Sequence, residues 1–328
     1  MNSKTLFYVL KRIGLAILTI WVVITITFFV MHAVPGGPFV GEKATTPAVQ
    51  AAMEAKYGLD KPVLEQYFTY LGDIVLRFDF GPSLKQRGRQ VIDIIADGMK
   101  VSAKLGLIAA FGALVVGIVL GAVAALQRNK VIDKVIMVIT TAFVSMPSFI
   151  AGALLLTIFA VSLHLLPANG AQKNGLILPV VTLGLYPMAY ITRLTRSSML
   201  DVLGISIGGL MRYTRTNMLE VLNADYIRTA RAKGVPGFKV IFGHALKNSL
   251  IPVITYFGPM LAYIVTGSIV VEQIFAVPGI GRAFVNSITG RDYPLIMGTT
   301  IILACLIIIM NLVSDLLYKI VDPRIELD

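Results

Sequence analysis

The segment DYIRTARAKGVPGFKVIFGHALKNS, residues 225–249, is basic and lies between long apolar runs. Asn223 or Asp225 can cap a first helix whose body is YIRTARAK, because short polar side chains accept hydrogen bonds from the first free backbone N–H groups. Arg231 and Lys233 suit the C-terminal end of that helix, where the helix dipole favours positive charge. Gly234 can end the helix, and Pro236 prevents its immediate continuation. The pattern predicts a short helix with a fixed end.

A second helix is predicted over FKVIFGHALKN, residues 238–248. Its apolar side chains recur at the spacing of one helical face: Phe238, Ile241, Phe242 and Ala245. Such a helix lies along a membrane surface, and the two helices together would make a rigid cytoplasmic projection. A basic loop held against anionic lipid is the alternative interpretation.

The composition places the chain among membrane proteins. Of its 328 residues, 56% are hydrophobic and 14% are charged, whereas a soluble domain carries about 25% charged residues. The net charge of +11 is typical of the cytoplasmic loops of a membrane protein, so we do not expect nucleic-acid binding. The single cysteine, Cys305, lies in an apolar run and is expected to serve packing.

Six transmembrane helices are predicted, which makes the chain an all-α polytopic membrane protein. The apolar runs cover residues 13–33, 102–126, 135–163, 175–192, 250–272 and 296–318. The first run is too long for a signal peptide and lacks a cleavage site, so we expect it to be retained. The third run is expected to kink at Pro147, and the fourth is short and holds Pro179 and Pro187.

The basic residues of the short loops predict the orientation. Lys4, Lys11 and Arg12 precede the first span, and the loop QRNKVIDK is also basic. The segment 193–247 holds nine basic residues against three acids. Both termini and this segment are therefore expected in the cytoplasm. The chain then divides into 1–33 (tail and first span), 34–101 (external loop with short helices), 102–192 (spans two to four), 193–249 (cytoplasmic loop) and 250–328 (spans five and six and the C-terminal tail).

The external loop is expected to contain two short helices. Thr46 before Pro47 suits a helix start, and Gly58 suits its end. Asp60 can cap a second helix, whose Tyr67, Phe68 and Tyr70 suit the membrane interface. The loop is either a structured cap over the bundle or a landing surface for an external partner.

The sequence lacks the groups that would supply its own energy or chemistry. No phosphate-binding loop, nucleophile motif or metal-ligand cluster occurs, and His32, His164 and His244 lie far apart. Ionisable residues are nearly absent from the predicted spans, where a proton- or sodium-driven transporter would need buried acids. We therefore expect no catalytic residue, no metal site and no cofactor in this chain, which would be a passive pathway driven by another protein.

The basic segment resembles the cytoplasmic EAA loop of ABC importer permeases. Arg228, Thr229 and Ala230 occupy the Glu-Ala-Ala positions, and Gly234 matches the motif glycine. Further elements resemble the B-type permease subunit of dipeptide and oligopeptide importers, in order and over nearly the whole chain. These are VPGGP, YGLDKPVLEQY, FDFGPSL, DYIRTARAKG, HALKNSLIPV, TGSIVVEQIFAVPGIG and DPRI.

The resemblance implies the type I ABC importer permease fold in a bacterial inner or plasma membrane. It also implies a second related permease chain, two ATP-binding subunits that hold ATP and Mg²⁺, and an external peptide-binding protein. The helix that couples to the ATP-binding subunits would contain Asp225, Tyr226, Arg228, Thr229, Ala230, Arg231, Lys233 and Gly234.

The fifth span supplies the candidate pathway residues. Gly258, Pro259 and Gly267 allow close helix approach beside a pathway, although plain packing is the alternative for each. Glu272 is a candidate gate or contact for the external binding protein, and the alternative is a solvated acid at the membrane surface.

An internal repeat precedes the coupling helix. RLTRSSMLDVL at 193–203 and RYTRTNMLEVL at 212–222 share seven of eleven residues, whereas the family pattern has one copy. A genuine insertion, a partly membrane-embedded piece and a splice of two related sequences remain open interpretations.

Three other functions compete with peptide import. Permeases for nickel or glutathione share the family, a stand-alone channel or ion-coupled transporter would act without ATP, and a peptide-sensing receptor would need a signalling partner. The sequence contains no signalling domain, and the absence of intramembrane acids argues against ion coupling.

Overall fold

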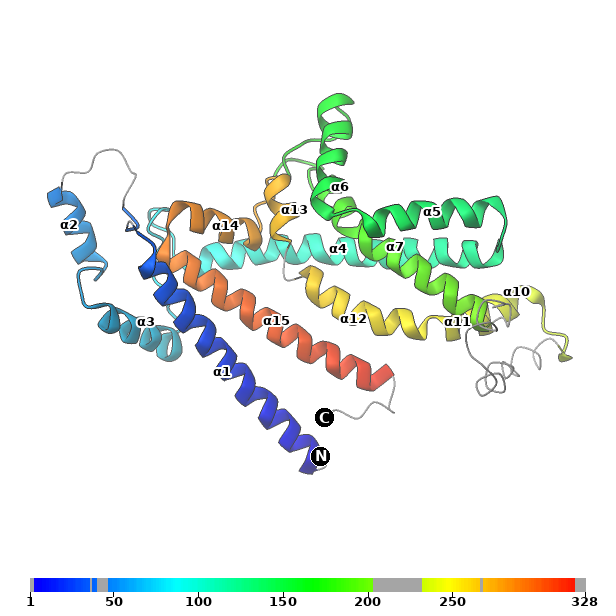
Figure 1. Cartoon of the computed structure of the whole chain (residues 1–328), viewed down its shortest axis with the longest axis horizontal. Helices are drawn as coiled ribbons and strands as arrows, with labels where there is room; N and C mark the ends of the chain where they lie inside the picture. The colour runs from blue at the N-terminus through cyan, green and yellow to red at the C-terminus, as the bar shows by residue number, and fades with distance from the viewer. Residues whose placement is uncertain (1–2, 36, 40–46, 203–231, 266–267, 322–328) are drawn as a thin grey trace.

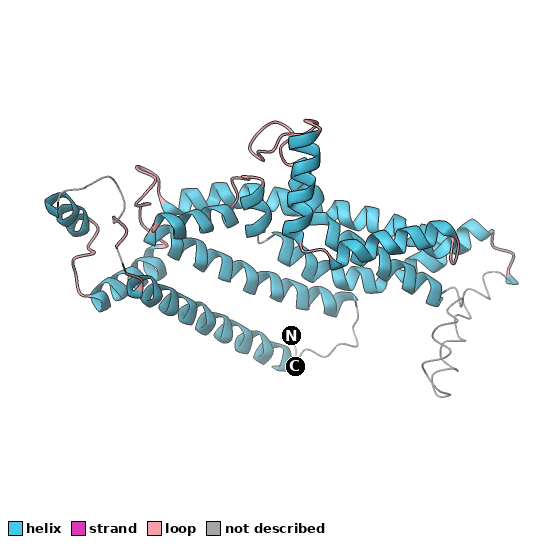
Figure 2. Cartoon of the chain, turned by 45° about the horizontal axis from the view of Figure 1, so that its top comes forward, coloured by secondary structure: helices cyan, strands magenta, loops and turns pink. Residues whose placement is uncertain are grey.

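The computed structural model describes residues 3–35, 37–39, 47–202, 232–265 and 268–321, which are almost entirely helical (Figures 1 and 2). Within these ranges the only extended pairing is an isolated bridge between Pro82 and Gln90. Long helices run roughly side by side, and short helices lie at both ends of the bundle (Figure 1). The predicted all-α architecture is confirmed.

Four helices are long and apolar enough to cross a membrane. They are α1 (Ser3–Ala33), α4 (Val91–Leu126), α7 (Ile177–Val202) and α15 (Tyr293–Val321). The described residues contain up to five spans if a sharply bent pair of helices is counted as one. The fifth predicted span, 250–272, is not among these candidates, so a count of six remains a prediction.

The second and fourth predicted spans are longer than expected. α4 begins at Val91 rather than near residue 102, and its 36 residues measure about 54 Å at the rise of an α-helix. α7 continues to Val202, past the predicted end at 192, because Pro187 interrupts only one hydrogen bond of the helix. The predicted start of the cytoplasmic loop at 193 therefore falls inside α7.

The third predicted span is two separate elements. α5 (Val131–Ser145) and α6 (Ser148–Leu155), continued by the π-helix η1 (Leu156–Ser162), meet at an angle of 109°. Met146 is extended because the following Pro147 disfavours the helical conformation. Pro147 then accepts hydrogen bonds from Ile150 and Ala151 at the start of α6. The predicted bend at Pro147 is confirmed, and it is a break between two helices and not a kink within one.

The fifth predicted span, 250–272, is also divided. α12 (Ile251–Val265) has 15 residues, whereas a straight crossing needs about 20. Beyond it lie α13 (Ile269–Ile274) and α14 (Ile280–Gly290), which lead into α15. Glu272 therefore belongs to a short connecting helix outside the candidate spans.

The centre of the bundle is the pairing of α4 with α7, which depends on small residues. A Cβ atom on Gly117 would lie 2.8 Å from Cγ2 of Ile191, and one on Gly121 would lie 2.6 Å from the carbonyl oxygen of Thr192. Glycine at these positions lets the two helix backbones approach closely, as in other membrane bundles.

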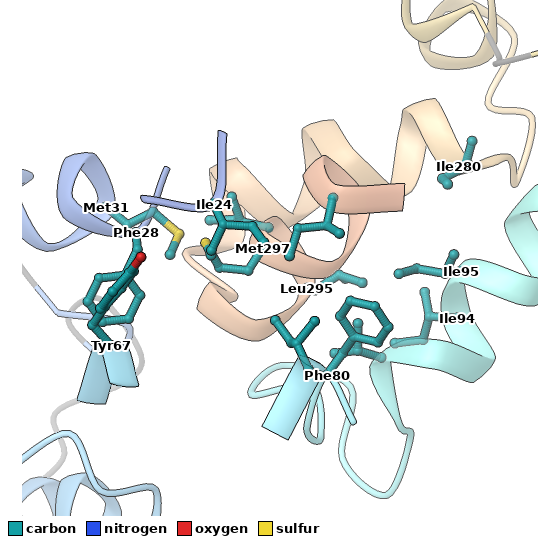
Figure 3. Packing of buried hydrophobic residues seen from close by; sticks show 14 residues of the cluster. Ile24, Phe28, Met31, Tyr67, Phe80, Ile94, Ile95, Ile280, Leu295 and Met297 are labelled. Atoms are coloured by element: carbon teal, nitrogen blue, oxygen red, sulfur yellow. The ribbon is translucent and has the colours of Figure 1, made fainter. Parts of the chain in front are cut away.

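The end of the bundle at which α4 begins holds an apolar cluster shared by α1, α3 (Val63–Arg77), α4 and α15. Figure 3 shows Phe28 and Met31 of α1 on one side of it and Phe80 on the other. Ser83 donates a short hydrogen bond to Asp292, and the backbone N–H of Leu84 donates to the same carboxylate at 3.0 Å. These contacts fasten the loop between α3 and α4 to the start of α15.

The two short helices of the predicted external loop are present. α2 (Pro47–Lys56) begins at Pro47, and Gly58 adopts the left-handed backbone (φ 66°) that ends it, as predicted. The prediction that Asp60 caps the next helix was wrong. α3 starts after Pro62, whose φ of −54° already suits a helix start. Thr46 lies outside the described residues.

Candidate functional site

The described part of the predicted coupling helix is its C-terminal end. Asp225, Tyr226, Arg228, Thr229, Ala230 and Arg231 lie outside the described residues, whereas Lys233 and Gly234 are described and exposed. Gly234 has φ +71°, and no atom lies within 4 Å of the position its Cβ would take. A side chain there would be opposed by the backbone conformation and not by crowding.

The segment after Gly234 is a chain of short helices. α10 (Gly237–Lys239) follows Pro236 and continues through the π-helix η2 (Val240–Ala245) into α11 (Leu246–Ser249). Because a π-turn contains more residues than an α-turn, the spacing of the predicted apolar face changes here. The single stripe predicted from the sequence is therefore split.

The two parts of that stripe have different surroundings. Ile241 of the stripe, together with Leu246 outside it, packs against a buried cluster of four residues at the ends of α4 and α7, namely Ala122, Ala125, Met199 and Leu200. Phe238 and Phe242 remain exposed, with ring centroids 4.5 Å apart. The side chain of Ala245 is outside the described set. Figure 1 shows α10 and α11 beside these helix ends, so the segment is docked on the bundle.

An ion pair near the same end joins α5 to α7. Arg196 Nε and Nη2 donate to the two carboxylate oxygens of Asp133 at 2.6 and 2.8 Å, and the backbone N–H of Asn129 donates to Asp133 at 2.9 Å. Asp133 is 3% exposed. Sequence reasoning missed this pair, although an aspartate in an otherwise basic loop was a signal of a specific partner.

The first copy of the repeat is the end of α7. Within it Thr195 and Met199 are fully buried, and Arg196 holds the ion pair. The second copy, residues 212–222, lies outside the described residues, as does Leu203.

Glu272 is fully buried, so the expectation of a solvated acid was wrong. Its Oε1 accepts a hydrogen bond from Ser102 Oγ at 2.6 Å, and its Oε2 accepts one from the backbone N–H of Arg282 at 3.1 Å. Ser102 Oγ in turn accepts from the backbone N–H of Ile280 at 2.9 Å. The carboxylate and the hydroxyl together satisfy the N-terminal N–H groups of α14.

Burial sets the electrostatics of this acid. Loss of solvent raises the pKa of Glu272, and the hydrogen bonds from Ser102, Arg282 and Gly281 oppose that effect. All of these partners are donors, so they favour the ionised carboxylate as acceptor. Glu272 is thereby a fixed joint between α4, α13 and α14.

A cavity of about 570 Å³ lies beside two of the predicted pathway residues. Pro259 lines it, and the adjacent Gly258 is buried, whereas Gly267 lies outside the described residues. The walls come from α6, α12, α13 and α15 and carry no charged side chain: Ser148, Pro259, Tyr263, Ser268, Ile269, Val270, Leu303, Ile307, Met310 and Asn311. Glu272 does not line this cavity.

The described residues contain no group of three or more His, Cys, Asp or Glu side chains that could hold a metal ion.

Two family models match the chain and together cover most of it. The model for the binding-protein-dependent transport system inner membrane component matches residues 117–327. The corresponding N-terminal model for membrane components of these systems matches residues 5–100.

Relatives of known name match over nearly the full length. The dipeptide transport system permease protein DppB of Bacillus subtilis is 46% identical over 98% of this chain and 98% of its own length. The oligopeptide transport system permease protein OppB of Escherichia coli K12 is 43% identical, covering 97% and 99%. A chain from an inward-facing structure of the MetNI methionine ABC transporter aligns with a TM-score of 0.50 at 16% identity, covering 70% of this chain and 97% of that chain.

Proposed function

The chain belongs to the family of binding-protein-dependent transport system inner membrane components, and we propose that it forms part of the pathway by which an ATP-driven importer moves di- or oligopeptides across the bacterial cell membrane. It is a membrane permease subunit without a catalytic role. The observation that carries the peptide assignment is full-length identity of 46% and 43% to dipeptide and oligopeptide permeases.

The cavity beside Pro259 supports a peptide as the transported solute. Its walls combine apolar side chains with the hydroxyl groups of Ser148 and Tyr263 and the amide of Asn311. Hydroxyl and amide groups can bond to a peptide main chain, which every peptide shares. Neutral walls would accept peptides of either charge, and selection would then rest with an external peptide-binding protein.

The proposed orientation places both termini in the cytoplasm, with six spans in all. Two segments that the charge pattern assigns to the cytoplasm support it, because they lie at one end of the bundle. The loop at 127–130 follows the end of α4, and η2 and α11 pack on the ends of α4 and α7. The loop containing Ser83 lies at the other end, fastened to Asp292.

The energy is proposed to come from partner subunits. Two ATP-binding subunits, which hold ATP and Mg²⁺, would grip the helix at 225–234, and this chain would contain no cofactor. A second related permease chain would complete the pathway, and the external peptide-binding protein would deliver the solute. The cleft between the permease chains would open alternately outward and inward.

The contacts of η2 and α11 suggest how movement is transmitted. Ile241 and Leu246 bear on α4 and α7, and the Asp133–Arg196 ion pair carries the movement on to α5. At the other end, Glu272 fixes α13 and α14 to α4. A displacement at residues 225–234 would thus reach Pro259 and Gly258 through packed helices.

Reconstitution tests this function directly. Vesicles containing the permease pair and its ATP-binding subunits, with binding protein outside and ATP inside, should accumulate labelled di- or oligopeptides. Vesicles without ATP, and vesicles containing this chain alone, should accumulate none. Uptake of nickel or glutathione in place of peptides would reassign the substrate, and uptake by this chain alone would contradict the importer mechanism.

A further inference from the structure

A second cavity, of about 270 Å³, lies at the outer end of the bundle, away from Pro259. α1, α3, the loop between α3 and α4, and the start of α15 enclose it. Figure 3 shows part of its wall, with Phe28 and Met31 on one side, Phe80 on the other and Met297 between them. Neither the pathway nor the coupling segment uses this cavity.

Five aromatic rings line this cavity: Phe28, Tyr57, Tyr70, Phe80 and Tyr293. The π-faces of such rings attract cations, and groups of them form the cages that recognise quaternary ammonium ions. One of these rings already takes part in such an interaction, because the ammonium of Lys56 lies 5.7 Å from the ring centroid of Tyr57.

The carboxylates and cations around the cavity give it an acidic bias. Asp79 lines it and accepts a hydrogen bond from the backbone N–H of Gly81 at 2.8 Å, and it has no ion pair among the described residues. The lining ammonium of Lys61 is bound to Glu65 at 2.7 Å, so its charge is neutralised locally. Asp73 also lines the cavity and is bound to Arg77 at 3.2 Å, so Asp79 is the lining carboxylate that remains for an incoming cation.

A polar group inside the cavity also lacks a partner. The hydroxyl of Tyr70 is buried and makes no hydrogen bond within the described structure. Such a group costs about 1–3 kcal/mol when it is left unpaired. A ligand with a hydroxyl or phosphate oxygen next to its cationic centre would satisfy it.

We propose that this cavity binds an organic ammonium group, held by the aromatic rings and Asp79, with Tyr70 donating to an oxygen of the same ligand. The group can arrive as a free amine cation or as the head group of an ethanolamine lipid, because both present the same chemistry. The site is separate from the peptide pathway and does not depend on the transport assignment.

Choline is a suitable probe, because it pairs a quaternary ammonium with a hydroxyl. The full chain is placed in nanodiscs of phosphatidylglycerol, which carry no amine, and choline is titrated by calorimetry. We expect saturable binding, and we expect the uncharged isostere 3,3-dimethyl-1-butanol to bind at least about tenfold more weakly. Equal binding of the two, or no saturable binding of choline, would overturn the proposal.

Two variants test the residues. Asp79→Asn keeps the oxygen that caps Gly81 but loses the charge, and it should weaken choline binding about tenfold. Tyr70→Phe should weaken it about threefold or more through loss of the donor. Asp97→Asn, in an exposed ion pair with Arg89, is the matched control and should leave binding unchanged. Thermal unfolding shows that each variant is folded, and wild-type affinity in both test variants would refute the site.

A titration in a second lipid composition distinguishes a lipid head group from a free cation as the ligand. In nanodiscs containing half phosphatidylethanolamine, a head group that occupies the cavity would compete and shift the choline titration to higher concentration. An unchanged titration would identify a free cation as the ligand. Both results require the Asp79-dependent binding measured in the first membrane.

Discussion

Ser102 of α4 donates a hydrogen bond of 2.6 Å to Glu272 of α13, and the same hydroxyl accepts one from the start of α14. The bond joins two helices that are far apart in the sequence. Both residues are buried, so solvent does not reach the bond. It makes α4, α13 and α14 one mechanical unit.

Replacement of Glu272 by Gln should loosen this unit. The amide offers one acceptor oxygen where the carboxylate has two, so a backbone N–H of α14 loses its partner. The free energy of unfolding should fall by about 1–3 kcal/mol, which thermal unfolding in nanodiscs measures. Ser287→Ala is the matched control, because that hydroxyl bonds only within its own helix to Phe284, and it should change stability by less than about 1 kcal/mol. Equal effects of the two changes would contradict the joint.

Replacement of Gly234 by Val should uncouple ATP hydrolysis from uptake. The left-handed backbone at φ +71° costs an L-residue about 1–2 kcal/mol, and a β-branched residue suffers most. The end of the coupling helix would then change direction, so that hydrolysis continues while peptide uptake per ATP falls.

The matched control for this change is Gly237→Ala, which has ordinary backbone angles and open space around it. It should transport normally, and Gly234→Asn should retain more uptake than Gly234→Val, because Asn tolerates the left-handed region. Normal transport by Gly234→Val would remove this residue from the coupling element.

The Asp133–Arg196 ion pair should contribute more to the stability of the fold than an exposed ion pair does. A double-mutant cycle with Asp133→Ala and Arg196→Ala should give a coupling energy of about 1–3 kcal/mol, because one partner is buried and two hydrogen bonds are made. The same cycle on the exposed Arg89–Asp97 pair should give less than about 1 kcal/mol. Similar coupling energies in thermal unfolding would show that burial adds nothing here.

Gly121→Ala should destabilise the α4–α7 pairing by about 1–3 kcal/mol, because the new methyl group would meet the backbone of Thr192. Gly112, on the same helix, has no atom within 4 Å of its Cβ position. Gly112→Ala should therefore be neutral or stabilising by about 0.5–1 kcal/mol. Thermal unfolding of the two variants compares them directly, and a stable Gly121→Ala would mean that the helices can separate without cost.

Deletion of residues 204–222 should leave a folded chain that still assembles with its partners. The first copy of the repeat already makes the contacts with the neighbouring helices. Met199 packs against α4, and Arg196 forms the ion pair with α5. The deletion removes the second copy and places Asn223 directly after Leu203. Co-purification with the ATP-binding subunits and peptide uptake measure the outcome, and loss of assembly would show that the longer connection is required.

The sequence by itself determined the helical class, the membrane environment and the family. Long apolar runs permit little else in a bilayer, because every backbone N–H and C=O must bond within its own segment. The start of α2 at Pro47 and its end at Gly58 were also predicted from the sequence, because both depend on local backbone preferences. The left-handed Gly234 agrees with its predicted role as a helix stop for the same reason.

Only the tertiary structure decided where helices break and which polar residues meet. α4 and α7 extend beyond their apolar runs because packing and hydrogen bonds stabilise a helix whether or not lipid surrounds it. A bend was expected at Pro147, but its angle of 109° and the continuity of α7 through Pro187 depend on how the helices pack. The partnership of Asp133 with Arg196 and of Glu272 with Ser102 spans long stretches of chain, and such pairs are fixed by the packing of helices and not by local sequence.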